Sequence, residues 1–111
     1  MAKYIKVYVT SGGGAELTGY RLIDIDNIKD IVQANTTTCV IQYADPAGGG
    51  AVDRVELTVA TMAANSPKLV DNIVATIETA LGQIYPIPAV SLTGIGAADA
   101  DVTITAFEYK T

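Results

Sequence analysis

The sequence has no histidine and no tryptophan, and it holds a single cysteine. Without histidine the chain lacks the commonest general base and the commonest metal ligand in proteins. Cys39 cannot form an internal disulfide, and it stands in an apolar, β-branched run with no basic neighbour that would lower the pKa of its thiol. We expect it to be a buried small hydrophobic residue. The residues indicate no enzymatic activity, and no catalytic, cofactor-binding or metal-binding residue is predicted.

Charge is also sparse. Only 17% of the 111 residues are charged, and 7 basic against 12 acidic residues give a net charge of −5. No cluster of lysine or arginine is present, which is the opposite of what a nucleic-acid-binding protein needs. No uninterrupted apolar run approaches the ~18 residues that span a bilayer, so no membrane partner is expected. Half of the residues are nevertheless hydrophobic, which predicts a surplus of apolar surface for contacts between subunits.

The carboxylates and glycines do not form a recognisable site. The spacing of Asp24, Asp26 and Asp30 is faintly like that of a calcium loop, but Lys29 occupies the position where that loop needs glycine. We therefore expect solvated turn residues at these positions and at the other loop aspartates, Asp45, Asp53, Asp99 and Asp101. The glycine runs at 12–14 and 48–50 lack the ending of a phosphate-binding loop and are predicted to be hairpin tips.

The clearest periodic signal lies between Ser66 and Gly82. Aliphatic residues recur there at helical spacing: Leu69, Val70, Ile73, Val74, Ile77 and Leu81. This spacing predicts an amphipathic helix over about residues 66–82. Asn65 or Ser66 can cap its start, Pro67 suits its first turn, and Gly82 can end it.

Most of the remaining chain has the alternating pattern of half-buried strands. The predicted strands are 4–9, 20–25, 28–34, 36–43, 52–60, 89–93 and 102–109. The connections between them are short, which favours antiparallel pairing throughout. The sequence therefore predicts a single α+β domain over residues 1–111, with a mostly antiparallel curved sheet and one helix packed across it.

The aromatic residues are mainly tyrosines, which suit protein interfaces because the ring is apolar and the hydroxyl tolerates water. We favour this use over the stacking of a ligand. The strongest candidates are Tyr4 and Tyr8 on the first predicted strand and Phe107 and Tyr109 on the last. The last strand is apolar on both faces, which predicts that a neighbouring subunit covers one of them.

Three segments also carry a resemblance to known proteins. The run RLIDIDNI from Arg21 to Ile28, the Thr36–Thr38 start of a hairpin and the helix from Leu69 to Leu81 resemble small virion-associated proteins of tailed phages, marine ones in particular. The resemblance implies a capsid decoration or cement protein that forms homo-oligomers and binds a major capsid protein. It places the protein in the virion after synthesis in the host cytoplasm, and the opening residues have no apolar secretory segment.

Two alternatives remain open. A subunit of a tail-tube or head–tail adaptor ring would use the same strand edges and loops to reach the next subunit. A small ligand-binding or regulatory module would hold a pocket between the helix and the sheet. A weaker similarity to short flagellar-type regulators fails after the helix, where this chain continues.

Overall fold

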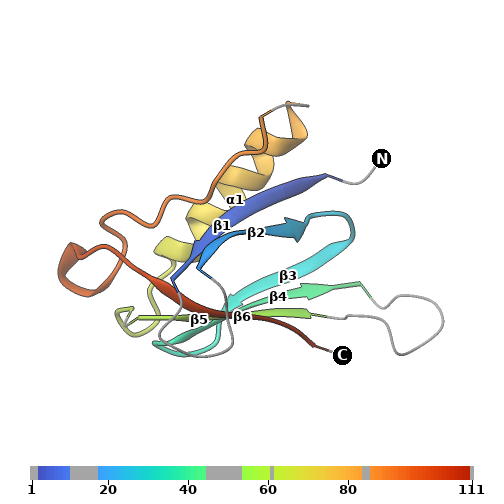
Figure 1. Ribbon diagram of the computed structural model, residues 1–111. Helices are drawn as coiled ribbons and strands as arrows, with labels where there is room; N and C mark the ends of the chain where they lie inside the picture. The colour runs from blue at the N-terminus through green and yellow to red at the C-terminus, as the bar shows by residue number, and fades with distance from the viewer. Residues whose placement is uncertain (1–2, 11–17, 45–53, 61, 84–85, 111) are drawn as a thin grey trace.

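The computed structural model describes residues 3–10, 18–44, 54–60, 62–83 and 86–110 (Figure 1). The two predicted glycine-rich tips, with Asp45 and Asp53, lie outside these residues. The strands are β1 (Tyr4–Val9), β2 (Gly19–Asp24), β3 (Ile28–Gln33), β4 (Thr38–Tyr43), β5 (Arg54–Val59) and β6 (Ile104–Lys110). The helix α1 (Lys68–Leu81) precedes a short 3₁₀ turn at Ala97–Asp99.

The fold is α+β, as predicted, with α1 packed against one six-stranded sheet. The strand order is β2-β1-β6-β5-β4-β3, and four of the five pairings are antiparallel. The prediction of antiparallel pairing throughout is wrong at β1 and β6, which run parallel and share one register pair, Val9 with Ile104. A parallel neighbour becomes possible because α1 brings the chain back to the start of β1, where Lys3 contacts its C-terminal end, and the segment after it returns the chain to the end of β1, where β6 begins.

The predicted strand at 89–93 is also wrong. Only Ala89 bridges to β1, at Lys6, where the Lys6 amide donates to the Pro88 carbonyl and the Val90 amide donates to the Lys6 carbonyl. Beyond Val90 the backbone bonds elsewhere: the Ser91 carbonyl accepts from the Asn72 side chain of α1 at 3.0 Å, and the Leu92 carbonyl accepts from the Val102 amide at 2.8 Å. The segment from Pro88 to Ser91 therefore runs alongside the helix, and the chain then loops through the 3₁₀ turn before it enters β6 (Figure 1).

The sheet curls strongly. Its outermost strands, β2 and β3, are consecutive in the chain and are joined only by residues 25–27. Near this turn two tyrosine hydroxyls cross to the free edge of β2: Tyr43 of β4 donates to the Asp24 carbonyl at 2.6 Å, and Tyr109 of β6 donates to the Leu22 carbonyl at 2.9 Å. Side chains thus satisfy backbone acceptors that a neighbouring strand would otherwise claim.

The core lies between the concave face of the sheet and α1. Its fully buried side chains include Ile5, Val7, Val9, Ile23, Ile41, Val55, Leu57, Leu69, Ile73 and Ile104. Alternate residues of each strand supply this inner face, as the period-two pattern predicts. The opposite, outer face carries the polar and partly exposed residues.

The helix buries a different line of residues from the predicted one: Leu69, Ile73, Thr76 and Ala80. Four residues turn an α-helix by about 400°, so a stripe that repeats every fourth residue drifts by about 40° at each step. Ile77 is therefore only partly buried, and Leu81 is exposed. Thr76 tolerates burial because its hydroxyl donates to the Asn72 carbonyl at 2.7 Å.

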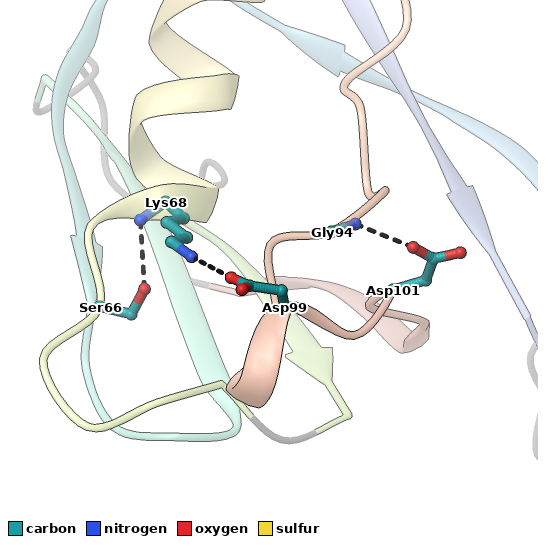
Figure 2. Close-up of polar contacts among 5 residues, drawn as sticks. All are labelled: Ser66, Lys68, Gly94, Asp99 and Asp101. Carbon is teal, nitrogen blue, oxygen red and sulfur yellow. Dashed lines mark hydrogen bonds and ion pairs between the residues drawn. The ribbon is translucent and has the colours of Figure 1, made fainter.

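Polar contacts fix both ends of α1. At the start, Ser66 Oγ accepts a long hydrogen bond of 3.4 Å from the Lys68 amide, and Lys68 Nζ lies 2.9 Å from Asp99 Oδ1 (Figure 2). At the end, where Gly82 follows the last helical residue, Lys3 Nζ donates to the carbonyls of Ala80 and Gln83. A lysine just before the first strand thus supplies the positive charge that suits a helix C-terminus.

Candidate functional site

The outer face of the β1–β2 hairpin carries a row of exposed aromatic side chains. Because Ile5, Val7 and Ile23 point into the core, the residues between them point outward. We call these residues the tyrosine face: Tyr4, Lys6 and Tyr8 of β1 with Tyr20, Leu22 and Asp24 of β2. The side chains of Tyr4, Tyr8, Tyr20 and Leu22 are 37%, 42%, 58% and 44% exposed.

The ladder register determines which residues of the face are neighbours. Tyr4 stands opposite Asp24, Lys6 opposite Leu22, and Tyr8 opposite Tyr20. The rings of Tyr8 and Tyr20 meet edge to face, with centroids 5.1 Å apart, and Lys6 Nζ lies 4.8 Å from the centroid of Tyr20. Such contacts order the aromatic side chains before any partner arrives, which lowers the entropy lost on binding.

The structure separates the four predicted interface residues. Tyr4 and Tyr8 belong to the tyrosine face, and Tyr109 is 51% exposed beside it, with its hydroxyl on the Leu22 carbonyl. Phe107 does not: it is 4% exposed and lies in the chain's own core. Its partner across the ladder is Leu57, a core residue, so this side of β6 faces inward.

Arg21 and Tyr109 complete the cover over Phe107. The Arg21 guanidinium carbon lies 5.9 Å from the centre of the Phe107 ring, and the Tyr109 ring meets it edge to face at 5.1 Å. The side of β6 that was predicted to meet a neighbouring subunit is therefore covered by β2 of the same chain. Phe107 is corrected from an interface residue to a core residue.

Tyr20 and Leu22 are the exposed apolar members of the face that sequence reasoning did not select. Their alternation with Arg21 and Ile23 places both on one side of a strand, and that signal is readable in the sequence. What the sequence does not contain is the pairing of this strand with the first one. Only the register brings Tyr20 against Tyr8 and Leu22 against Lys6.

Several of the aspartates predicted as turn residues accept hydrogen bonds from backbone amides, and two of them, Asp24 and Asp30, lie in strands β2 and β3 and not in turns. Asp24 Oδ1 accepts from the Asp26 amide, Asp30 Oδ1 from the Ile31 amide, and Asp101 Oδ1 from the Gly94 amide, the last shown in Figure 2. The hydrogen bond from Lys68, and then its charge, lowers the pKa of the exposed Asp99 carboxyl. Among the described residues no group of three or more cysteine, aspartate or glutamate side chains could hold a metal ion.

Cys39 is buried in the core, as predicted, and burial raises the pKa of its thiol to about 12. Burial, with the nearby Asp24 carboxylate adding to it, also raises the pKa of the Tyr43 hydroxyl well above its usual value. The same two causes raise the pKa of Tyr109. All three groups are therefore protonated and uncharged near neutral pH, and none is an activated nucleophile.

A shallow groove of about 270 Å³ lies between α1 and the segment from Pro88 to Ser91. Its lining residues are all uncharged: Asn72, Ala75, Thr76, Thr79, Pro88, Ala89 and Ser91. Ligand pockets typically enclose roughly 300–1,000 Å³ and bring together a few directed polar groups. The groove is slightly smaller than that, and Thr76 already uses its hydroxyl proton within the helix.

No family model, no curated protein and no solved structure matches this chain. Within the described part of the chain, no helix has the length and apolar character needed to cross a bilayer.

Proposed function

We propose that this chain is a structural subunit of a tailed-phage virion, a capsid decoration or cement protein that acts through protein–protein contacts. The tyrosine face is the observation that carries the proposal. Three tyrosines and a leucine, exposed side by side on a rigid two-stranded ladder, leave roughly 300 Å² of mostly apolar surface in water. Patches of this size on small proteins are often functional.

The composition of the face suits contact with a protein surface. Tyrosine is enriched at interfaces and among the residues that dominate binding, and its ring loses little conformational entropy when it is buried. A standard interface buries roughly 800 Å² on each partner, so the tyrosine face is large enough for the centre of one and needs a polar rim around it. The resemblance of RLIDIDNI and of the helix to virion-associated proteins supports a phage particle as the place of the partner.

The mechanism is geometric. Copies that bind side by side on an assembled shell hide their tyrosine faces against neighbouring copies, and each interface added on the shell stabilises the assembled state by mass action. Many weak contacts repeated over a lattice add up to tight retention, since neighbouring sites raise the effective concentration of each copy.

The test uses particles of the phage that encodes the chain. Density-gradient-purified virions are analysed by mass spectrometry, and the chain is located on them by immunogold electron microscopy. We expect the chain to co-purify with particles and the gold to label heads. Labelling confined to tails would replace the capsid assignment with the tail-tube or adaptor alternative. A chain found in the soluble lysate and absent from particles would overturn the proposal.

A further inference from the structure

The tyrosine face carries one positive and one negative side chain in a chain whose net charge is −5. Lys6 and Asp24 are both half-buried, and neither forms an ion pair with another described residue. Lys6 Nζ lies over the Tyr20 ring, and Asp24 uses one oxygen to accept from the Asp26 amide. Each therefore keeps hydrogen-bonding capacity for a charged partner outside the chain.

The ladder places these two charges on a diagonal. Lys6 stands opposite Leu22 and Tyr4 opposite Asp24, so the four residues form the corners of a near-square of about 5 Å across the strands and about 7 Å along them. Lys6 and Asp24 occupy one diagonal, while Tyr4 and Leu22 occupy the other. A two-fold axis along the Tyr4–Leu22 diagonal exchanges the positions of the two charges.

We propose that the tyrosine face is the contact between two copies of this chain, related by a two-fold axis that sets Lys6 of each copy against Asp24 of the other. This inference deepens the proposed function, and rests on it, in taking the tyrosine face as the contact surface. In a two-fold interface every contact between different residues occurs twice, so one diagonal produces two ion pairs. Tyr4 and Leu22 lie along the axis and meet their own counterparts between those pairs.

Charge complementarity is what favours a second copy as the occupant. Most of the chain's surface is acidic in balance, so two copies repel each other over most orientations. The tyrosine face is neutral in sum, and it is self-complementary through Lys6 and Asp24. Tyr4 and Leu22, which lie on the axis, make up only part of the roughly 300 Å² of mostly apolar surface on each tyrosine face, well below the roughly 800 Å² of a standard interface, so the dimer is weak and forms at high local concentration.

Sedimentation equilibrium tests the proposal, with protein from about 10 μM to about 1 mM, the range in which weak association is measurable. We expect a monomer–dimer equilibrium for the natural chain. Lys6→Glu replaces two attractions by two repulsions and should raise the dimer Kd about 10-fold or more. The double variant Lys6→Glu/Asp24→Lys reverses both charges and should restore the Kd to within about 3-fold of the natural value, while Lys29→Glu, an equal charge change at an exposed position of β3, should leave it unchanged.

A second variant guards against misfolding, because Asp24→Lys also removes the hydrogen bond to the Asp26 amide. Asp24→Asn keeps an oxygen that can accept this bond and removes only the charge, so it should weaken the dimer about 3-fold or more and flatten its salt dependence. A natural chain that stays monomeric throughout overturns the inference. So does a dimer that Lys6→Glu weakens no more than Lys29→Glu does, or that the double reversal fails to restore.

The inference and the proposed function fail separately. A chain that is monomeric in solution but present on purified particles overturns the two-fold contact and leaves the virion role standing. A charge-dependent dimer that is absent from particles overturns the virion role and leaves the contact standing.

Discussion

At Cys39, burial alone accounts for both the chemical inertness of the thiol and its effect on stability. The side chain has no exposed surface, and its pKa rises from an ordinary 9.0 to about 12. The unfolded chain therefore loses its thiol proton at a lower pH than the folded chain does. The contribution of the neutral thiol to the free energy of unfolding is fully present below about pH 9. It is lost as the pH rises toward 12, because deprotonation favours the unfolded state.

We expect Cys39→Ala to flatten the alkaline decline in stability. The measurement is urea unfolding, under reducing conditions, at pH values from about 8 to about 11. Tyr43 and Tyr109 also have raised pKa values, and their deprotonation lowers the free energy of unfolding in the same way above about pH 10. The effect of the thiol is therefore the difference between the natural chain and Cys39→Ala in the slope of this free energy against pH. Parallel slopes would contradict a buried, neutral thiol.

Asn27 makes the turn between β2 and β3 with a positive φ of 64°. Its carbonyl accepts from the Ala44 amide at 2.8 Å, which ties this turn to the end of β4. Residues with a Cβ disfavour this conformation by about 1–2 kcal/mol, whereas asparagine tolerates it and glycine adopts it freely.

Asn27→Ala should lower the free energy of unfolding by about 1 kcal/mol, and Asn27→Gly should leave it nearly unchanged. Chemical denaturation of the two variants beside the natural chain measures both effects. An equal loss in the alanine and glycine variants would show that the asparagine side chain matters and the backbone conformation does not.

At the scale of the element, α1 shows where sequence periodicity succeeds and where it stops. The pattern correctly predicts a helix that begins near Ser66 and ends at Gly82. It does not predict that Thr76 and Ala80 are buried. The aliphatic residues recur at every fourth position, whereas the residues that face the sheet are spaced alternately by four and three. Position on the helix cylinder, not hydrophobicity, decides burial at Leu81.

For the strands too, the sequence pattern predicts some features correctly and misses others. Alternation predicts five strands before the helix and one at the end of the chain, with bounds that differ by at most two residues from β1 through β6 where both ends are described. It wrongly predicts a strand at 89–93, where the backbone after Val90 bonds to Asn72 of the helix and to Val102. It also carries no information about which strands pair, neither the β1–β2 ladder nor the parallel neighbour of β1, so the assembly of the tyrosine face could not be predicted from the pattern.

Ile73 and Val74 make a matched pair for testing the packing of α1. Ile73 has no exposed surface, whereas the neighbouring Val74 is 40% exposed. Ile73→Asp buries an unpaired carboxylate and should lower the free energy of unfolding by several kcal/mol. For a domain of this size, that loss leaves most molecules unfolded at 25 °C. Val74→Asp should change it by about 0.5 kcal/mol or less. Circular dichroism with thermal melting reads both, and a folded Ile73→Asp variant would contradict the assigned face.

On the scale of the whole molecule, the sheet consists of two parts with a narrow connection. Among the described residues, the hairpin β1–β2 meets the ladder of β3, β4, β5 and β6 through one register pair, Val9 with Ile104, and through the Thr10 amide, which donates to the Ile104 carbonyl at 2.7 Å. The hydroxyls of Tyr43 and Tyr109 on the free edge of β2 add two side-chain hydrogen bonds between the two parts. These two hydroxyls therefore hold the strand that carries Tyr20 and Leu22 in place.

Removing both hydroxyls should loosen β2 without unfolding the rest. In Tyr43→Phe/Tyr109→Phe we expect the amides of β2 and of the turn at residues 25–27 to exchange about 30-fold faster, since two hydrogen bonds of about 1 kcal/mol each are lost and local openings report the stability of the unit that opens. The amides shared by β4 and β5 should keep their protection, because that ladder is central and fully paired. Tyr8→Phe, which removes a hydroxyl from the tyrosine face, is the control. Native-state hydrogen exchange separates the outcomes. Equal acceleration of all amides would mean that the two parts of the sheet open together. Unchanged exchange of the β2 amides would mean that apolar packing alone holds the hairpin, because water then satisfies the carbonyls of Leu22 and Asp24 equally well.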